Sequence, residues 1–406
     1  MVNSVKISTV ITSLIFVAAA SSAVANDFPE GKGKEAVQAI CSACHNVNRI
    51  STGLGYSREH WLALMDSMID LSGDKAQQNM IADYLAKNFP PNTKRAPTLV
   101  EGKSTLEFKE WVVPTLGQRS RDPVEAPDGS IWWVGQWGNL MGRIDPESGK
   151  MQEYPLPAGA MPHSVTPDDA GFMWYTGNKN GTIGRLDPAD GSIKVYEMPD
   201  PQARDPHTAV FDKNGILWFT LQHSNRIGRL DPVTGETDLI EAPTSGSRPY
   251  GIKVDEFGDI WVACNGSNCL IKVDHKTLEM TEIKLPHELT TVRRLDIAAD
   301  GMIWYVNSGR GRLGQYNPSN GEIREWPSPS GAKSQVLDGV VWYNESGMRP
   351  DALVRFDPKS ETFQSWAVPS GDFYAGIIRH MRPTRDGNLL IHQSSTNRII
   401  HVKISD

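Results

Sequence analysis

Short apolar segments separated by turn residues recur along most of this chain. An apolar residue followed by Trp comes after a Gly-containing turn six times, and a weaker seventh copy completes the set Ile131-Trp132, Met173-Trp174, Leu217-Trp218, Ile260-Trp261, Ile303-Trp304, Val341-Trp342 and Leu389-Leu390. A second marker, an Asp or Asn turn such as Leu186-Asp187-Pro188, recurs at intervals of 40 to 44 residues. This period with short strands is typical of four-stranded propeller blades. The pattern predicts an all-β, seven-bladed propeller over residues 105–406.

The first and last strands of this region are expected to pair with each other. Residues 106–111 have the pattern of the outer strand that ends each repeat, although they precede the first repeat. Pairing with residues 399–404 would close the ring. Six or eight blades are the alternatives, and a solenoid is disfavoured because neither terminal unit resembles a cap.

The segment before the repeats has a helical period instead. Apolar residues at 61, 64, 65 and 68 fall on one helical face, and a later helix through residues 80–85 stops before Pro90-Pro91. With a short helix over residues 31–40, this pattern predicts a small all-α domain at residues 26–92. Residues 93–104 are polar and have no period, so we expect a linker between two domains.

The first residues predict export from the cytoplasm. An apolar stretch over residues 10–20 precedes Ala23-Val24-Ala25, the small-x-small pattern that signal peptidase cleaves. The stretch is about half of the ~20 residues that a bilayer core requires, so residues 1–25 are expected to be removed and the mature protein to have no membrane span. The predicted location is the periplasm. A net charge of −7 argues against nucleic acid as a partner.

The run Cys41-Ser42-Ala43-Cys44-His45 has the spacing of covalent haem attachment. Two Cys three residues apart form thioethers with the haem vinyl groups, and the next His coordinates the iron. The alternatives are a redox-active Cys pair and half of a zinc site. A zinc site needs a second Cys/His pair nearby, which the sequence lacks. Residues 26–92 resemble a small class I cytochrome c domain, so we predict one covalent haem c on Cys41, Cys44 and His45.

A Met is expected on the other side of the haem iron. The candidates are Met65, Met68 and Met80, although a Met at helical spacing is more often part of a core. Met68 is favoured because it ends the amphipathic helix just before Leu71-Ser72-Gly73, where the chain can fold over the open haem face. Met65 is the second choice. Ligation by His and Met would raise the reduction potential relative to two His ligands.

One position of each repeat is expected to face the propeller axis. Eight residues before the successive turn Gly residues stand Arg121, His163, His207, Tyr250, Arg293, Gly331 and Arg379. A shift of one residue would bring in Arg294 and His380 instead. Arg119, Asp205 and Arg248 precede ring positions by two residues, and Gln222 lies in a facing loop.

This set of residues predicts an anionic ligand. Guanidinium groups match carboxylate or phosphate, so Arg121, Arg293, Arg379 and Arg248, with Tyr250 and Gln222, are candidate substrate-binding residues. His163, Asp205 and His207 are candidate catalytic residues, because adjacent His side chains supply a general base or a metal ligand. The alternative is that polar ring positions hold only water.

The repeat Leu217-Trp218-Phe219-Thr220, followed by Asn225-Arg226-Ile227-Gly228-Arg229-Leu230, resembles the streptogramin (virginiamycin) B lyase family. The resemblance covers residues 105–406. It implies a seven-bladed propeller that opens a cyclic depsipeptide by elimination, with Mg²⁺ held by carboxylates and histidines. The family's Glu-Pro-His motif corresponds to Asp205-Pro206-His207, and its other histidine to His163. Its second carboxylate falls at Gln222, and an uncharged amide is a weaker ligand for a hard cation, which counts against Mg²⁺ and antibiotic cleavage.

Cys264 and Cys269 flank a predicted hairpin turn at Asn265-Gly266-Ser267-Asn268. In an exported protein these cysteines form either a cross-strand disulfide or two buried thiols. The sequence leaves both readings open.

Three functions compete on this sequence. The main prediction is an exported mono-haem cytochrome that transfers electrons, with a propeller that binds a small anionic substrate or a periplasmic electron donor or acceptor. The alternative is a streptogramin B lyase-like carbon–oxygen lyase with an accessory cytochrome domain. The third is a propeller that only docks the cytochrome on a partner. An elimination has no use for a one-electron carrier, which favours the first reading.

Overall fold

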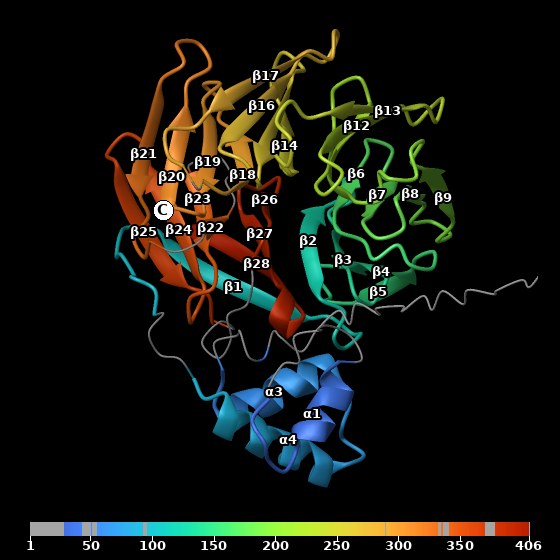
Figure 1. Cartoon of the computed structure of the whole chain (residues 1–406), viewed down its shortest axis with the longest axis vertical. Coiled ribbons are helices and arrows are strands. Elements are labelled where there is room, and N and C mark those ends of the chain that lie inside the picture. Colours follow the sequence, from blue (N-terminus) through green and yellow to red (C-terminus); the bar gives the residue numbers. More distant parts are fainter. Residues whose placement is uncertain are drawn as a thin grey trace, which may run out of the picture.

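The computed structural model of the chain describes residues 28–42, 50, 55–91, 96–288, 290–331, 334–335, 341–369 and 378–405. Its blades surround a central axis, and the helices lie together on one side of them (Figure 1). The signal peptide predicted at residues 1–25 lies outside the described residues. Within the described residues, no helix is both long enough and apolar enough to cross a membrane.

Among the described residues before the propeller lie three helices, α1 (Lys34–Cys41), α3 (Arg58–Met68) and α4 (Lys75–Asn88). The Ser57 hydroxyl accepts a hydrogen bond from the first turn of α3, and the Asp74 carboxylate does the same for α4. Such N-caps satisfy backbone donors that have no partner within the helix. Trp61, Leu64 and Ile81 pack in a core that these helices share. The helices predicted from the apolar period are confirmed.

Each of the first six blades is built from four consecutive strands. Blades one to three contain β2 (Ser120–Glu125), β3 (Ile131–Gly135), β4 (Leu140–Ile144) and β5 (Met151–Pro155); β6 (Val165–Pro167), β7 (Met173–Gly177), β8 (Thr182–Leu186) and β9 (Ile193–Glu197); and β10 (Pro206–Phe211), β11 (Leu217–Leu221), β12 (Arg226–Leu230) and β13 (Thr237–Glu241). Blades four to six contain β14 (Pro249–Val254), β15 (Ile260–Cys264), β16 (Cys269–Val273) and β17 (Met280–Lys284); β18 (Val292–Ile297), β19 (Ile303–Asn307), β20 (Arg312–Tyr316) and β21 (Ile323–Pro327); and β22 (Ser334–Gln335), β23 (Val341–Glu345), β24 (Ala352–Asp357) and β25 (Thr362–Ala367).

The seventh blade joins the two ends of the propeller. Its strands are β26 (Met381–Pro383), β27 (Leu389–Gln393), β28 (Arg398–Ser405) and β1 (Thr105–Val112), with a short 3-10 helix, η3 (Ser394–Thr396), between β27 and β28. β1 and β28 are antiparallel, with Leu106 opposite Ile404 and Trp111 opposite Ile399. The predicted seven blades and the predicted closure of the ring are both confirmed.

The Trp marker has a physical cause in the turn that precedes it. In blade three the Asp212 carboxylate accepts backbone N–H groups of its own turn and the indole N–H of Trp218, at 3.0 Å. Asp168 with Trp174 and Asp255 with Trp261 repeat this arrangement. In these three blades the Trp therefore fixes a turn as well as filling the core between strands.

The innermost strands are bulged where they approach the axis. Pairing shifts register between Arg121 and Val124 in β2, between Pro206 and Ala209 in β10, and in the same way in β14 and β18. An extra residue in a strand re-aims the neighbouring side chains. The bulges therefore decide which residues of each blade face the axis.

The helices rest on the propeller face that carries the loops before each innermost strand. The Ser67 carbonyl at the end of α3 accepts N–H groups from Gly117 and from the side chain of Asn397, at the ends of the β1–β2 and β27–β28 loops. The Arg349 guanidinium lies over the Tyr56 ring at 4.1 Å. The segment between the helices and β1 is also attached to the propeller. The N–H of Val100 donates to the hydroxyl of Ser365 in β25, and the carbonyl of Val100 accepts the N–H of Ser365. The helical segment thus covers part of one propeller mouth.

Candidate functional site

Three aromatic side chains of adjacent blades stack at the propeller axis. The His163 and His207 rings are 3.4 Å apart between centroids, and the Tyr250 ring is 4.0 Å from that of His207. All three are buried, at 4%, 3% and 3% exposure. The structure therefore brings together three of the predicted ring residues, in the order of their blades.

Guanidinium groups surround this stack. Arg294 lies over the Tyr250 ring at 5.3 Å and donates to the Thr208 hydroxyl, which also contacts Nδ1 of His207. Arg121 donates to the Gln136 side chain at 2.8 Å. The Nε atoms of Arg121, Arg294 and Arg379 are buried and have no hydrogen-bond partner among the described residues. Buried cations with unused donors favour an anion at this position.

The positive charges act strongly on Tyr250. Burial opposes ionisation of its hydroxyl, but Arg379, Arg294 and Arg121 outweigh burial and lower the pKa of Tyr250 to about 7. Burial and the like charges lower the pKa of Arg121 to about 9, so this guanidinium remains charged at neutral pH. At pH 7 the phenol is therefore divided between its neutral and ionised forms.

The axial histidines are held neutral. Burial and the charge of Arg121 hold the pKa of His163 well below its ordinary value, and burial and Arg294 do the same for His207. His392, behind them, accepts the N–H groups of Arg379 and His380 on Nε2, so its ring proton is on Nδ1, beside the Ser394 hydroxyl. These rings are packing and hydrogen-bonding groups at neutral pH.

One buried carboxylate, which sequence reasoning missed, counters the arginines. Asp122 lies in the bulge of β2 at a φ of +57° and accepts the N–H of Val165 in the next blade. It also pairs with His380 and, at 3.2 Å, with Arg382, both beside the other end of the ring. An Asp next to the predicted axial residue Arg121 was the available signal. Asp122 links blades one, two and seven.

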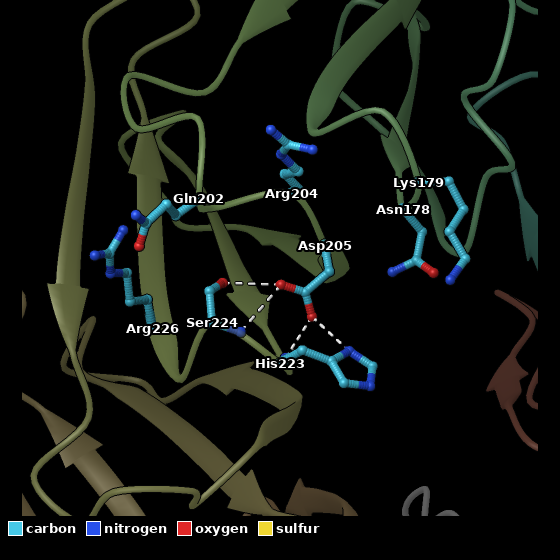
Figure 2. Close-up of a pocket in the computed structure, with 8 residues that line it drawn as sticks. All are labelled: Asn178, Lys179, Gln202, Arg204, Asp205, His223, Ser224 and Arg226. Atoms are coloured by element: carbon cyan, nitrogen blue, oxygen red, sulfur yellow. Dashed lines mark hydrogen bonds and ion pairs between the residues drawn. The ribbon is translucent and has the colours of Figure 1, made fainter. Parts of the chain in front are cut away.

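An open pocket of 550 Å³ lies beside the stack, between blades two and three. Figure 2 shows its lining, which is Asn178, Lys179, Gln202, Arg204, Asp205, His223, Ser224 and Arg226. The side-chain N–H of Asn178 donates to the Pro206 carbonyl, one residue before His207. The pocket therefore adjoins the axial histidines, on the face that the helices partly cover.

Asp205 faces this pocket and is fully engaged there. One carboxylate oxygen accepts the backbone N–H of His223 and contacts its Nδ1 at 2.9 Å. The other accepts the backbone N–H of Ser224, at 3.3 Å, and its hydroxyl, at 2.8 Å (Figure 2). The sequence predicted Asp205 as a catalytic residue. In the structure its carboxylate is occupied by groups of His223 and Ser224.

The remaining predicted ring residues are more scattered. Arg293 donates to the side chain of Asn265 instead of reaching the stack, because the bulge in β18 turns Arg294 inward. Arg248 is exposed on the rim, and Gln222 is half-buried next to His223. Gly331 contributes no side chain. The structure joins Arg121, His163, His207, Tyr250 and Arg379, and adds Arg294, which the sequence offered only as a register alternative.

The residues present do not fit a magnesium site. Mg²⁺ requires oxygen ligands that are free to coordinate, with near-octahedral geometry. Both oxygens of Asp205 are taken by four N–H and O–H groups, and Gln222 replaces a carboxylate by an amide. The axial histidines lie among guanidinium groups, which repel a cation.

Cys264 and Cys269 lie opposite each other at the ends of β15 and β16. Both are thiols in this structure, with the Cys269 thiol donating to the Cys264 sulfur at 2.7 Å. Asn265, next in the chain, accepts the hydrogen bond from Arg293. The pair is part of the packing of blade four.

The predicted haem residues are only partly described. Cys44 and His45 lie outside the described residues. Cys41 ends α1 and Met68 ends α3, and both are half-buried against the core that the helices share. Met65 is buried in that core, and Met80 is half-buried on α4. Attachment of a haem therefore stays a prediction.

Comparison with known proteins identifies relatives of the propeller. Residues 101–273 match the model of the virginiamycin B lyase family. Virginiamycin B lyase from Staphylococcus aureus is similar over 74% of this chain and 99% of its own, with 23% identity and a TM-score of 0.66. A streptogramin B lyase structure covers 74% of this chain and 98% of its own, with 21% identity and a TM-score of 0.67.

A third similar structure is a catalytically inactive form of the Staphylococcus aureus virginiamycin B lyase, in which alanine replaces a histidine, with quinupristin. It covers 73% of this chain and 99% of its own, with 24% identity and a TM-score of 0.65. No curated protein sequence matches the chain. These structures show the fold of the propeller.

The prediction that the chain works mainly as an electron-transfer cytochrome is wrong. The matched family and the similar structures are lyases, so they support the alternative, a lyase-like propeller. They lend no support to the predicted cytochrome c domain. A haem motif specifies only a cofactor, whereas most of the chain builds the propeller, so the motif does not define the function of the chain.

Proposed function

We propose that the propeller is a carbon–oxygen lyase of the streptogramin B lyase type, acting in the pocket between blades two and three. The observation that carries this proposal is the pocket's place beside the His163 and His207 stack, lined by a His–carboxylate pair and by cations. The family match over residues 101–273 supports it.

The reaction is a β-elimination from an ester. A base removes the proton on the carbon next to a carbonyl, and that electron pair forms a C=C bond to the neighbouring carbon. The bond from that carbon to the ester oxygen breaks, and the carboxylate leaves with its electrons. The site must therefore accept one proton, stabilise negative charge on the carbonyl oxygen, and hold a carboxylate product.

The chain has groups for each of these tasks. His223 is the nitrogen base that lines the pocket, and Lys179 and Arg204 supply positive charge there. Behind them, Arg121 and Arg294 make the axis positive. This charge distribution favours a substrate that becomes more negative as it reacts, which an ester elimination does.

The substrate class that fits is an ester whose alcohol carbon is β to a carbonyl group. Cyclic depsipeptides contain this unit, as does any O-acylated threonine or serine amide. Gln222 stands where the resemblance places a carboxylate, so the ligand is expected to differ from the streptogramins themselves. A smaller acyclic ester suits a pocket of 550 Å³.

The test is to incubate the purified full chain with an O-acylthreonine amide and with a streptogramin B antibiotic. Elimination from the cyclic ester leaves its mass unchanged while creating a conjugated C=C bond that absorbs in the ultraviolet. Hydrolysis would add the mass of one water and create no such absorbance. Turnover with the first signature supports a lyase; turnover with the second identifies an esterase.

The matched variant is His207→Ala. The inactive Staphylococcus aureus lyase carries a histidine-to-alanine change, and His207 is the histidine that the motif resemblance places at the site. Loss of elimination in folded His207→Ala, measured beside circular dichroism, supports an essential role of the stack. Full activity in that variant would move the chemistry away from the axis.

We propose in addition that the helical segment is an accessory haem module in an exported protein. Cys41 and Cys44 would hold the haem and His45 would bind its iron, and Met68 shares the core that Cys41 contacts. The bound group would supply a covalent iron porphyrin. Haem staining of a denaturing gel tests the attachment directly, because only a covalent haem stays on the unfolded chain; the double variant Cys41→Ser/Cys44→Ser must lose the stain.

A further inference from the structure

We infer that His223, held by Asp205, is the proton acceptor of this pocket, and that Asp205 is a positioning residue rather than a metal ligand. The inference rests on the proposed lyase function and names the base of its reaction. It also assigns a metal-free route to this chain, whose resemblance implies a magnesium-dependent one.

The first step is the saturation of the Asp205 carboxylate. Two carboxylate oxygens offer about four lone-pair positions. Here four donors occupy them: the backbone N–H groups of His223 and Ser224, the Ser224 hydroxyl and Nδ1 of His223. A metal ion at Asp205 would have to displace some of these donors. The local chain is therefore folded around a carboxylate that binds protein groups.

The second step is the ring orientation of His223. Its Nδ1 lies 2.9 Å from a carboxylate oxygen, which only accepts, so Nδ1 carries the proton. The lone pair of the neutral ring is then on Nε2, for which the described residues provide no hydrogen-bond partner. The side chain is 69% exposed and projects into the pocket (Figure 2). A His oriented by a carboxylate with its second nitrogen free is the arrangement of a general base.

The third step is the charge that faces this base. Arg226 pairs with Asp200 and is largely neutralised. Lys179, on the opposite wall, makes no ion pair among the described residues, and the Arg204 side chain donates only to the Pro201 carbonyl. These two cations are placed to bind the enolate oxygen and the leaving carboxylate, which is the task that a metal performs in a metal-dependent elimination.

The fourth step is access. His163 and His207 are buried and are held neutral among guanidinium groups. Proton removal by a ring with 3% exposure would require the substrate to enter the packed axis. His223 reaches the same face from the pocket side. In the reaction its Nε2 takes the proton from carbon, becomes the imidazolium paired with Asp205, and later gives the proton to solvent.

The kinetic test compares His223→Gln, Asp205→Asn and the control His275→Gln. His275 makes the same contact with Asp259, at 2.8 Å, in blade four outside the pocket. We expect His223→Gln to lower kcat by about 100-fold or more, the usual range for removing a general base. Asp205→Asn should lower kcat less, with KM little changed, and His275→Gln should match the parent. The parent should keep its rate in EDTA.

Two kinetic results overturn the inference while leaving the lyase proposal intact. The first is a parent whose elimination stops in EDTA and returns with Mg²⁺. The second is a His223→Gln variant that retains the parent kcat. Absence of any elimination by the parent is a different outcome: it contradicts the lyase proposal, and the inference is then decided by the measurement without substrate.

That measurement is the ¹⁵N NMR spectrum of the imidazole rings, assigned with His223→Gln. Free neutral histidine mainly carries its proton on Nε2, so a proton on Nδ1 of His223 reports its contact with Asp205. We expect the Nδ1–H form in the parent and its loss in Asp205→Asn, with no change at His223 on addition of Mg²⁺. An Nε2–H form in the parent, or a shift of the His223 signals with Mg²⁺, overturns the inference.

Discussion

The axial cluster and the blade two–three pocket contain similar residues but differ in almost every physical respect. The axis holds His163, His207 and Tyr250, which are all buried, among arginines. The pocket holds His223 with Asp205, and its imidazole is mostly exposed. The two groups lie on one face of the propeller, and in the chain only Pro206 separates Asp205 from His207.

This difference separates the groups that set the stability of the propeller from those that are available for chemistry. At the axis, burial and the neighbouring arginines lower the pKa values of His163 and His207, and the arginines lower that of Tyr250 against the effect of burial, so every change of charge is coupled to folding. In the pocket a side chain can change its charge or contacts at little cost to the fold. The predictions below measure that separation.

The largest effect on stability is expected from Asp122. Asp122→Ala removes the carboxylate that His380 and Arg382 contact and leaves buried cations without a counter-charge. We expect the free energy of unfolding to fall by about 3–5 kcal/mol, measured by urea denaturation. Asp122→Asn is the control, because Asn tolerates the φ of +57°. An Asp122→Asn variant with the same free energy of unfolding as the parent would mean that the charge of Asp122 is unimportant for stability.

The buried histidines should make the propeller sensitive to acid. In the folded state the pKa values of His163, His207 and His392 lie well below 6.5, so the unfolded chain takes up more protons as the pH falls below 6.5. Their stabilising contribution is present above that pH and is lost below it, by up to about 1.4 kcal/mol per pH unit for each ring. Urea denaturation between pH 7 and pH 5 measures the slope. His392→Gln should reduce it, and an unchanged slope would contradict neutral burial of that ring.

A smaller effect on stability is expected from Tyr250, which contributes in its ionised form, whereas the histidines contribute in their neutral form. Its pKa is about 7 in the folded chain against 10 ordinarily, so between these values the unfolded chain binds the extra proton. The contribution of Tyr250 therefore rises with pH across this window, is complete above pH 10, and is lost as the pH falls through 7. The difference between parent and Tyr250→Phe should grow by up to about 1.4 kcal/mol per pH unit. Tyrosinate absorbance of the native protein measures the pKa of Tyr250 independently. Absence of any tyrosinate signal below pH 9 would contradict the expected shift.

The smallest effect on stability is expected in the pocket. His223→Gln should change the free energy of unfolding by no more than about 0.5 kcal/mol, because the exposed ring fills no core position. The same substitution at His207 should cost several times more, since that ring is packed against His163 and Tyr250. Equal costs at the two positions would remove the distinction between axis and pocket. The comparison requires only thermal or urea unfolding curves.

The features that local chemistry determines were accessible from the sequence. In blades two, three and four the Trp marker donates to an Asp six residues earlier, as Trp218 does to Asp212, so short-range contacts account for this part of the repeat. The pairing of residues 106–111 with 399–404 followed from the same repeat, because an outer strand without a blade needs a partner. The two His of the stack were found for the same reason.

The features that depend on bulges and distant pairs were not accessible. A bulge in β18 turns Arg294 to the axis and Arg293 to Asn265, and the sequence shows no difference between the two arginines. Asp122 meets His380 only because the ring closes. His223 lies outside the predicted ring positions, and its contact with Asp205 depends on how two loops meet.

The pairing of β1 with β28 also has a consequence for how the chain acquires its structure. Every other blade can form from residues close together in sequence, whereas the seventh needs residues 398–405 before residues 105–112 find their place. Non-local contacts of this kind form late and slow the folding of β proteins. During synthesis the nascent chain will carry six blades and an unpaired strand edge, a state open to wrong pairing with other chains. Synthesis of β28, the last strand of the propeller, thus ends the exposure of this edge.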